Sequence, residues 1–291
     1  RDDVESRGLG DVYKRQIIIN KKYTELKILN KGDDTINNCS YSLFICFAAE
    51  DRYSIVEPLV YHLKNYGIKT WYDRDKLLMG DNREEINLEK GVWKCNYALV
   101  VISKFTVDSV CAMEELSIIE SKYRQGKIIV FPVVYELSPN DIPDRLCWIK
   151  ELIFKEVDRH SGTREVCSHI VCKITGNILN NCIHQKVRDI ISTSQEILPS
   201  GVYDIIRSYL QIDHANLNSR ISLLYAAYLV ITDTKRINAN SITNMVSCVF
   251  DRLFSETRLN LPVDYRELWL LENSLCILID FYIDSCTESR I

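Results

Sequence analysis

Residues 97–116 read YALVVISKFTVDSVCAMEEL, and this stretch decides the fold that we expect for the chain. Residues 97–102 are apolar without polar alternation, and Ser103 ends the run. A strand of this kind is buried on both faces, as in the middle of a parallel sheet that is covered by helices. From Ser109 onward the apolar residues recur at helical spacing. The stretch therefore predicts a buried parallel strand that leads through a loop into a helix.

The expected helix carries two consecutive glutamates on different faces. Its core stripe consists of Ala112, Leu116, Ile119 and Tyr123. Glu115 shares a stripe with Cys111 and Ile118, at the edge of the core face, whereas Glu114 lies on the polar side. Open α/β sheets bind ligands beyond the carboxyl ends of their strands. Glu115 is therefore the candidate for chemistry, and a solvated helix glutamate is the alternative interpretation.

Strands and helices alternate over residues 41–179. Strands are expected at 41–47, 69–73, 97–103 and 127–135, with a short fifth strand within 148–157. The helix after the second strand should place Ile86, Lys90 and Trp93 on one face. This alternation predicts an α/β domain with a five-stranded parallel sheet in the flavodoxin-like strand order 2-1-3-4-5. The order has its switch point between the first and third strands, so loop 48–51 and Glu115 should flank one crevice.

The pattern changes after residue 180. Apolar residues recur at helical spacing over 202–210, 217–231, 242–254 and 265–282, without any strand-like run. We therefore predict an α/β domain over 41–180 and a smaller all-α domain of about four helices over 181–291. Residues 1–40 are expected to be a lead-in, and the first 16 of them resemble translated cloning sequence.

Composition narrows the class of protein. The net charge of -4 gives no basic footprint for nucleic acid or an acidic membrane surface. The eleven cysteines show no C-x-x-C and no zinc-ligand spacing, so reduced thiols are expected rather than disulfides or a metal site. No apolar run is long enough for a transmembrane helix, and no signal peptide is recognised, so a cytoplasmic protein is expected.

Three segments, taken in order, resemble the TIR (Toll/interleukin-1 receptor) domain family. Residues 43–51, LFICFAAED, are similar to its first box, with Cys46 at a position that is usually Ser. Residues 67–81 resemble its second strand and BB loop. Residues 109–116 resemble the segment S-x-W-C-x-x-E-L, with Cys111 in place of the Trp. The resemblance covers residues 41–179.

The alignment of the third segment has two versions. One keeps Ser109, Glu115 and Leu116 together and makes Glu115 the motif glutamate. A shift of one residue instead aligns Cys111 with the family's Cys and makes Glu114 that glutamate. We prefer Glu115, because helical periodicity independently places it beside the core.

The resemblance implies an activity. In TIR enzymes of bacteria, plants and animals, the motif glutamate is required to cleave NAD at the nicotinamide–ribose bond. The leaving group is a cationic pyridinium and needs no general acid, and a carboxylate stabilises the oxocarbenium-like ribose. The resemblance thus implies a bacterial-type NAD hydrolase or cyclase of anti-phage immunity, with Glu115 catalytic and NAD as substrate rather than cofactor.

The family also suggests partners and an alternative function. TIR active sites are often completed by a neighbouring copy, so a homo-oligomer held by TIR–TIR contacts is expected, with neither nucleic acid nor membrane as partner. The alternative is a non-catalytic TIR scaffold that signals through self-association, because fold alone does not determine function.

Around the nucleotide, the resemblance places Phe47, Ala48, Ala49, Asp51, Trp71, Asp73 and Ser103. These positions have structural alternatives. Trp71 could pack in the core, Asp51 could cap the following turn, and the residues at 47–49 could be plain loop. No cofactor and no metal site is expected.

Overall fold

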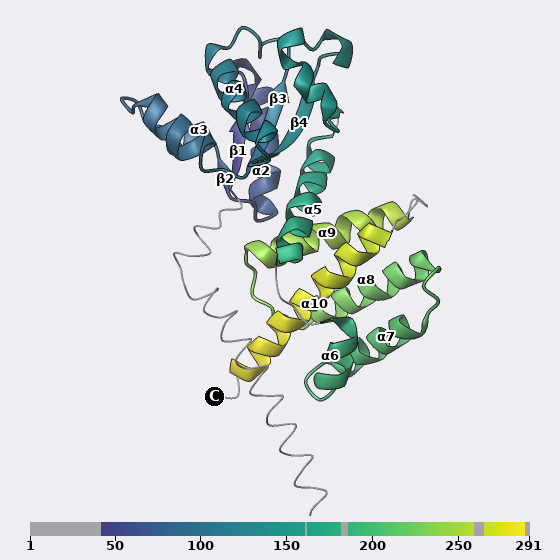
Figure 1. Ribbon diagram of the computed structural model, residues 1–291. Helices are drawn as coiled ribbons and strands as arrows, with labels where there is room; N and C mark the ends of the chain where they lie inside the picture. The colour runs from purple at the N-terminus through teal and green to yellow at the C-terminus, as the bar shows by residue number, and fades with distance from the viewer. Residues whose placement is uncertain (1–41, 161, 182–185, 259–264, 289–291) are drawn as a thin grey trace, which may run out of the picture. The chain divides into compact units, whose positions relative to one another are not determined.

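A computed structural model describes residues 42–160, 162–181, 186–258 and 265–288 (Figure 1). The predicted lead-in at 1–40, including its first 16 residues, lies outside the described residues. The strands are β1 (Leu43–Cys46), β2 (Thr70–Trp71), β3 (Tyr97–Ile102), β4 (Ile129–Tyr135) and β5 (Lys155–Val157). They form one parallel sheet in the order β2-β1-β3-β4-β5. The predicted fold class and strand order are confirmed.

Strand β3 lies at the centre of the sheet, as its apolar run predicts. Tyr97 pairs with Leu43 of β1 on one side and with Ile129 of β4 on the other. All six residues of β3 are buried. Ala98, Val100 and Ile102 join one core cluster with helix α4 (Val110–Arg124). The start of α4 is therefore tied to the carboxyl edge of the sheet.

The other helices of this region connect the strands. The regular helices are α2 (Glu57–Asn65), α3 (Asp73–Lys76) and α5 (Thr163–Asn181). Shorter or irregular helical turns are η1 (Ala49–Asp51), η2 (Arg52–Val56), η3 (Glu84–Val92), η4 (Pro139–Asp141) and η5 (Asp144–Glu151). Helix α4 contacts η3, and α2 contacts α5.

Helix η3 differs from its predicted phase. It is a π-helix, and the Trp93 amide donates to the Leu88 carbonyl five residues earlier, at 3.0 Å. The wider turn buries Asn87 and Val92 and leaves Trp93 half exposed. The predicted face of Ile86, Lys90 and Trp93 is therefore wrong, because the prediction assumed a period of 3.6 residues.

In the described part of the chain, five helices follow the sheet domain. They are α6 (Val187–Thr193), α7 (Ser200–Gln211), α8 (Leu217–Asp233), α9 (Ser241–Arg258) and α10 (Tyr265–Glu288). Helices α6 to α10 share one hydrophobic core. Of them, α6 was not anticipated. The helical character predicted after residue 180 is confirmed, and the division into two domains at that point stays a prediction. Within the described ranges, no helix has the length and apolar character needed to cross a membrane.

Contacts between the helical region and the sheet domain include the packing of α9 and α10 against α5. Gly67 follows the end of α2 with φ +85°, and the Ser241 hydroxyl donates to its carbonyl. A Cβ at Gly67 would lie 2.4 Å from the Ser241 carbonyl oxygen. Glycine is thus required at residue 67 both for the turn and for this contact.

Candidate active site around Glu115

Glu115 lies in the second turn of α4, close to the carboxyl edge of the sheet. The helix begins at Ser109, whose hydroxyl accepts a hydrogen bond from the Ala112 amide at 3.3 Å. Glu115 is buried, with 7% of its surface exposed, whereas Glu114 is exposed. The helical phase predicted for the two glutamates is therefore correct.

Three segments meet at the Glu115 carboxylate. The Asn87 side-chain amide, from η3, donates to Glu115 Oε1 at 2.6 Å. Arg83 Nη2 lies 3.8 Å from the same oxygen, and its Nη1 bonds Glu114 at 2.6 Å. The thiol of Cys46, the last residue of β1, donates to the Ala112 carbonyl at 3.7 Å and lowers the pKa of Glu115. Among the described residues, the carboxylate thus has one close hydrogen-bond donor, Asn87, and one more distant ion-pair partner, Arg83.

This environment raises the pKa of Glu115 from 4.5 to about 7. Burial is the largest cause, because it penalises the charged form. The Cys46 thiol, Arg83 and Asn87 act in the opposite direction but do not offset it. Near neutral pH, Glu115 is therefore divided between its protonated and ionised forms. The ionised form of Glu115 would be stabilised by a positive charge placed beside it.

Asn87 connects Glu115 to Trp71. The Trp71 indole Nε1 donates to Asn87 Oδ1 at 3.3 Å, which leaves the Asn87 amide nitrogen for Glu115. The indole also lies against Gly91, where a Cβ would stand 2.6 Å from Nε1. Trp71 is partly buried against the core cluster, as its structural alternative expects. Sequence reasoning missed Asn87, because the period assumed for η3 did not turn it inward.

Asp51 and Ser103 meet at the switch point of the sheet. The Ser103 hydroxyl donates to Asp51 Oδ2 at 2.6 Å, joining the ends of β1 and β3. Burial raises the pKa of Asp51. Asp51 Oδ1 has no hydrogen-bond partner among the described residues. The side chain makes no capping hydrogen bond, so the capping alternative is wrong. Asp51 has no exposed surface, and as it stands it joins two loops rather than facing solvent.

Asp73 and Phe47 gather around Arg52 instead of Glu115. Asp73 accepts two hydrogen bonds from Arg52, at 2.8 and 2.7 Å. The Arg52 guanidinium lies over the Phe47 ring, 5.1 Å from its centre. Ala48, the next residue after Phe47, is buried, and Ala49 is exposed. The structure therefore places the predicted residues in three neighbouring groups, centred on Glu115, Asp51 and Arg52.

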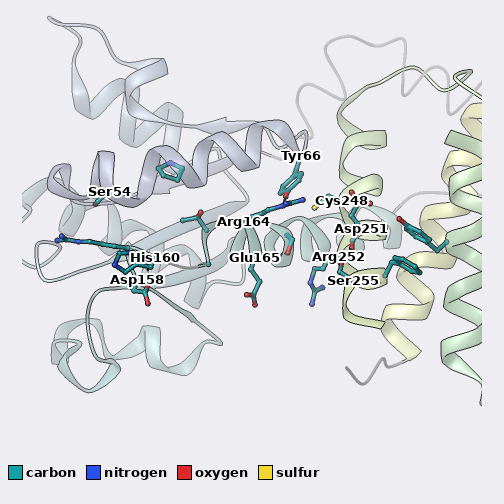
Figure 2. Close-up of a pocket in the computed structure, with 17 residues that line it drawn as sticks. Ser54, Tyr66, Asp158, His160, Arg164, Glu165, Cys248, Asp251, Arg252 and Ser255 are labelled. Carbon is teal, nitrogen blue, oxygen red and sulfur yellow. Dashed lines mark hydrogen bonds between the residues drawn. The ribbon is translucent and has the colours of Figure 1, made fainter. Parts of the chain in front are cut away.

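A large cavity of about 990 Å³ lies among other residues (Figure 2). Its walls come from α2, the loop before α5, the first turns of α5, and α8 and α9. Figure 2 shows Tyr66 and Arg164 facing each other there, and Arg164 Nε donates to the Tyr66 hydroxyl at 3.2 Å. None of the residues predicted for the nucleotide lines this cavity. The carboxylates and the arginines in its lining are equal in number, so the charge of the lining favours neither an anionic nor a cationic ligand.

Comparison with known proteins gives the sheet domain a family. A model described as TIR domain matches residues 43–164. The NAD(+) hydrolase TcpA of Theionarchaea archaeon is 30% identical over 116 residues, which are 40% of this chain and 35% of that protein. The NAD(+) hydrolase TcpC of Escherichia coli is 30% identical over 133 residues, or 45% and 42% of the two chains. The 2' cyclic ADP-D-ribose synthase AbTIR of Acinetobacter baumannii is 29% identical over 104 residues, or 36% and 38%. The matches span less than half of these relatives.

Proposed function

Because residues 43–164 are a TIR domain, we propose that this domain cleaves NAD at the nicotinamide–ribose bond with Glu115 as the catalytic carboxylate. The observation that carries the proposal is the placement of Glu115. It is a buried carboxylate near the carboxyl edge of the sheet, oriented by Asn87, with a pKa raised to about 7. Support also comes from the relatives, several of which are named NAD(+) hydrolase or 2' cyclic ADP-D-ribose synthase.

The chemistry needs a negative charge more than it needs an acid. In NAD the nicotinamide ring is cationic, and the bond from C1′ to the ring nitrogen breaks with its electron pair going to that nitrogen. Neutral nicotinamide leaves, and the positive charge moves onto the ribose. An ionised Glu115 would stabilise this charge in surroundings that solvate it poorly. Water that attacks C1′ and loses a proton gives ADP-ribose, whereas a hydroxyl of the same molecule gives a cyclic product.

Substrate binding should favour the active form of Glu115. Its burial raises the pKa by disfavouring the ionised carboxylate. A pyridinium placed beside the carboxylate reverses this preference, because an opposite charge lowers a carboxyl pKa. Asn87 would keep Glu115 Oε1 oriented throughout, because Trp71 engages the Asn87 oxygen and the Asn87 nitrogen therefore points to Glu115. Asn87 is thus a positioning residue in this proposal.

The proposal is tested by nicotinamide release from NAD, measured chromatographically with purified protein. Glu115→Ala should lose activity by roughly a hundredfold or more, the effect typical of a lost electrostatic stabiliser. Glu114→Ala is the matched control, because Glu114 is exposed and its ion-pair partner among the described residues is the partly exposed Arg83. Such a pair is worth about 0–1 kcal/mol, so the control should keep most of the activity. Loss in Glu114→Ala alone would shift the alignment by one residue.

A second candidate function is a TIR scaffold, favoured by the loop at 74–81. Leu78 is 79% exposed and Met79 is fully exposed, so two large apolar side chains point outward from this loop. Adjacent apolar side chains of this kind suit a protein–protein contact. We propose self-association through this loop, whether or not the domain is catalytic. The roles in anti-phage defence and in the cytoplasm stay predictions.

The enzyme and the scaffold predict different results when Glu115 or the loop at 74–81 is changed. Sedimentation across a dilution series should show self-association in the wild type and its loss in a Leu78→Ser, Met79→Ser double variant. An enzyme assembled through the loop would show specific activity that rises with protein concentration. A scaffold alone would self-associate and release no nicotinamide at any concentration, with Glu115→Ala behaving like the wild type. A wild type that is monomeric at every concentration would contradict both forms of the self-association proposal.

A further inference from the structure

A second cavity, of about 360 Å³, lies within the helical region. Its walls come from α6, α7, α8 and α10 and from the loop that joins α7 to α8. The volume is near the lower end of the range for small-molecule sites. Neither the sheet nor any residue predicted for NAD contributes to it. The cavity is therefore a candidate site of its own, and nothing said of it rests on the proposed function.

The wall of this cavity contains a buried arginine. Arg220 is 6% exposed, and its Nη2 donates to the Tyr209 hydroxyl at 2.7 Å. Its Nη1 lies 3.1 Å from His214 Nδ1, and the guanidinium stacks 4.5 Å from the centre of the Tyr209 ring. Arg220 Nε is buried and has no hydrogen-bond partner among the described residues. A buried guanidinium remains charged and is costly unless it is compensated.

Glu272 compensates Arg220 only in part. Its Oε2 lies 3.9 Å from Arg220 Nη2, at the limit of an ion pair, and it accepts a hydrogen bond from the Tyr209 hydroxyl. Two further cationic side chains, Lys186 and Arg188, line the same cavity. Within the described part of the chain, neither of them has an ion-pair partner. With Asp189 as the other acid, the lining holds three Lys or Arg against two carboxylates, together with His214.

We propose that this cavity binds a small molecule through its phosphate group, with Arg220 at the closed end and Arg188 and Lys186 at the open side. Arginine presents a planar set of donors that matches phosphate oxygens. The lining carries one more positive charge than its two carboxylates balance, and two of its three cations are guanidiniums, whose paired donors suit the oxygens of a phosphate. The cavity has the volume of roughly twelve water molecules, so it has room for an organic group beside the phosphate. The class of ligand is therefore a phosphomonoester of nucleotide size or smaller.

A purely structural role for Arg220 is the competing explanation. In that case the Tyr209–Arg220–Glu272 contacts stabilise the helices, and Lys186 and Arg188 are ordinary surface cations. The two explanations separate at Arg188, which is exposed and takes no part in those contacts. Removing Arg188 affects a ligand site but leaves a structural pair untouched. Arg207 on α7 is a matched control, because it is exposed and lies outside the cavity lining.

The test uses the whole chain, with calorimetry and thermal unfolding in the presence of inorganic phosphate, AMP or acetate. Phosphate and AMP should bind saturably and raise the Tm, AMP more strongly, whereas acetate should not. Arg188→Ala should weaken AMP binding at least about tenfold, or about 1.4 kcal/mol, without changing the Tm of the free protein. Arg207→Ala should bind AMP like the wild type. Arg220→Lys should bind more weakly still, and if it fails to fold the Arg188 and Arg207 variants decide.

Three results would overturn the proposal. The first is no saturable binding of phosphate or AMP at about 10 mM, a concentration at which a millimolar site would be mostly occupied. The second is equal binding by the Arg188 and Arg207 variants. The third is binding only to vesicles that contain phosphatidic acid, which would assign the phosphate to a lipid headgroup at a membrane surface instead of a free small molecule.

Discussion

Replacing Glu115 with glutamine should stabilise the folded protein above pH 7 while it removes the proposed activity. Glutamine keeps the shape of the side chain and still accepts the hydrogen bond from Asn87. It cannot ionise, so it avoids the cost of holding a charge in a buried position. Stability and activity should thus change in opposite directions at one residue, as expected where a site is built at the expense of stability.

The size of the stability change follows from the pKa of Glu115. Burial raises this pKa from 4.5 to about 7 in the folded protein. Below pH 4.5, both the folded and the unfolded chain hold the proton, and the group adds no pH dependence. Between pH 4.5 and 7 the unfolded chain ionises first, so the wild type loses stability as pH rises. At about 1.4 kcal/mol per pKa unit, the loss reaches roughly 3 kcal/mol above pH 7.

Urea unfolding of the wild type and Glu115→Gln at pH 5, 6, 7 and 8 measures this effect. The variant should be the more stable protein at pH 8, and the gap should widen by roughly 2 kcal/mol from pH 5 to pH 8. Parallel pH curves for the two proteins would refute the reasoning. A variant that is less stable at pH 8 would show that Glu115 is an ionised structural residue.

Three further predictions follow from the same contacts. kcat/KM for NAD should rise with pH and level off above about pH 7, because only ionised Glu115 stabilises the cationic ribose; a fall between pH 6 and 8 would contradict this. Asn87→Ala should lower kcat roughly tenfold or more and move that pH profile upward, since it removes a hydrogen bond that lowers the pKa of Glu115; a purely structural Asn87 would leave the profile in place. Gly91→Ala should destabilise the fold by about 1–3 kcal/mol in urea unfolding, because the new Cβ displaces the Trp71 indole; unchanged stability would show that the indole moves freely.

Local periodicity was enough to predict the sheet and the position of Glu115. Residues 97–102 are apolar on both faces, so they had to form a strand covered on both sides. Helix α4 keeps a regular period, and the edge position predicted for Glu115 follows directly from that period. The exposed position of Glu114 follows in the same way.

The parts of the site that were not predicted depend on altered helix geometry or on long-range contacts. Asn87 turns inward because η3 is a π-helix, with a hydrogen bond from the Trp93 amide to the carbonyl five residues earlier. No residue type in that segment indicates this geometry. Asp51 is engaged by Ser103, which lies 52 positions along the chain, so its local turn could not reveal its partner. The pairing of Arg52 with Asp73 likewise needs β1 and β2 side by side.

Nicotinamide release from NAD at pH 8, measured for the wild type and Glu115→Gln at equal protein concentration, tests the central claim most directly. At this pH the variant should be the more stable protein, so lost activity cannot be assigned to unfolding. We predict release by the wild type and a rate at least about a hundredfold lower for Glu115→Gln. A variant rate within about threefold of the wild type, or no release by the wild type at any concentration, would contradict the assignment of Glu115 as the catalytic carboxylate of an NAD-cleaving TIR domain.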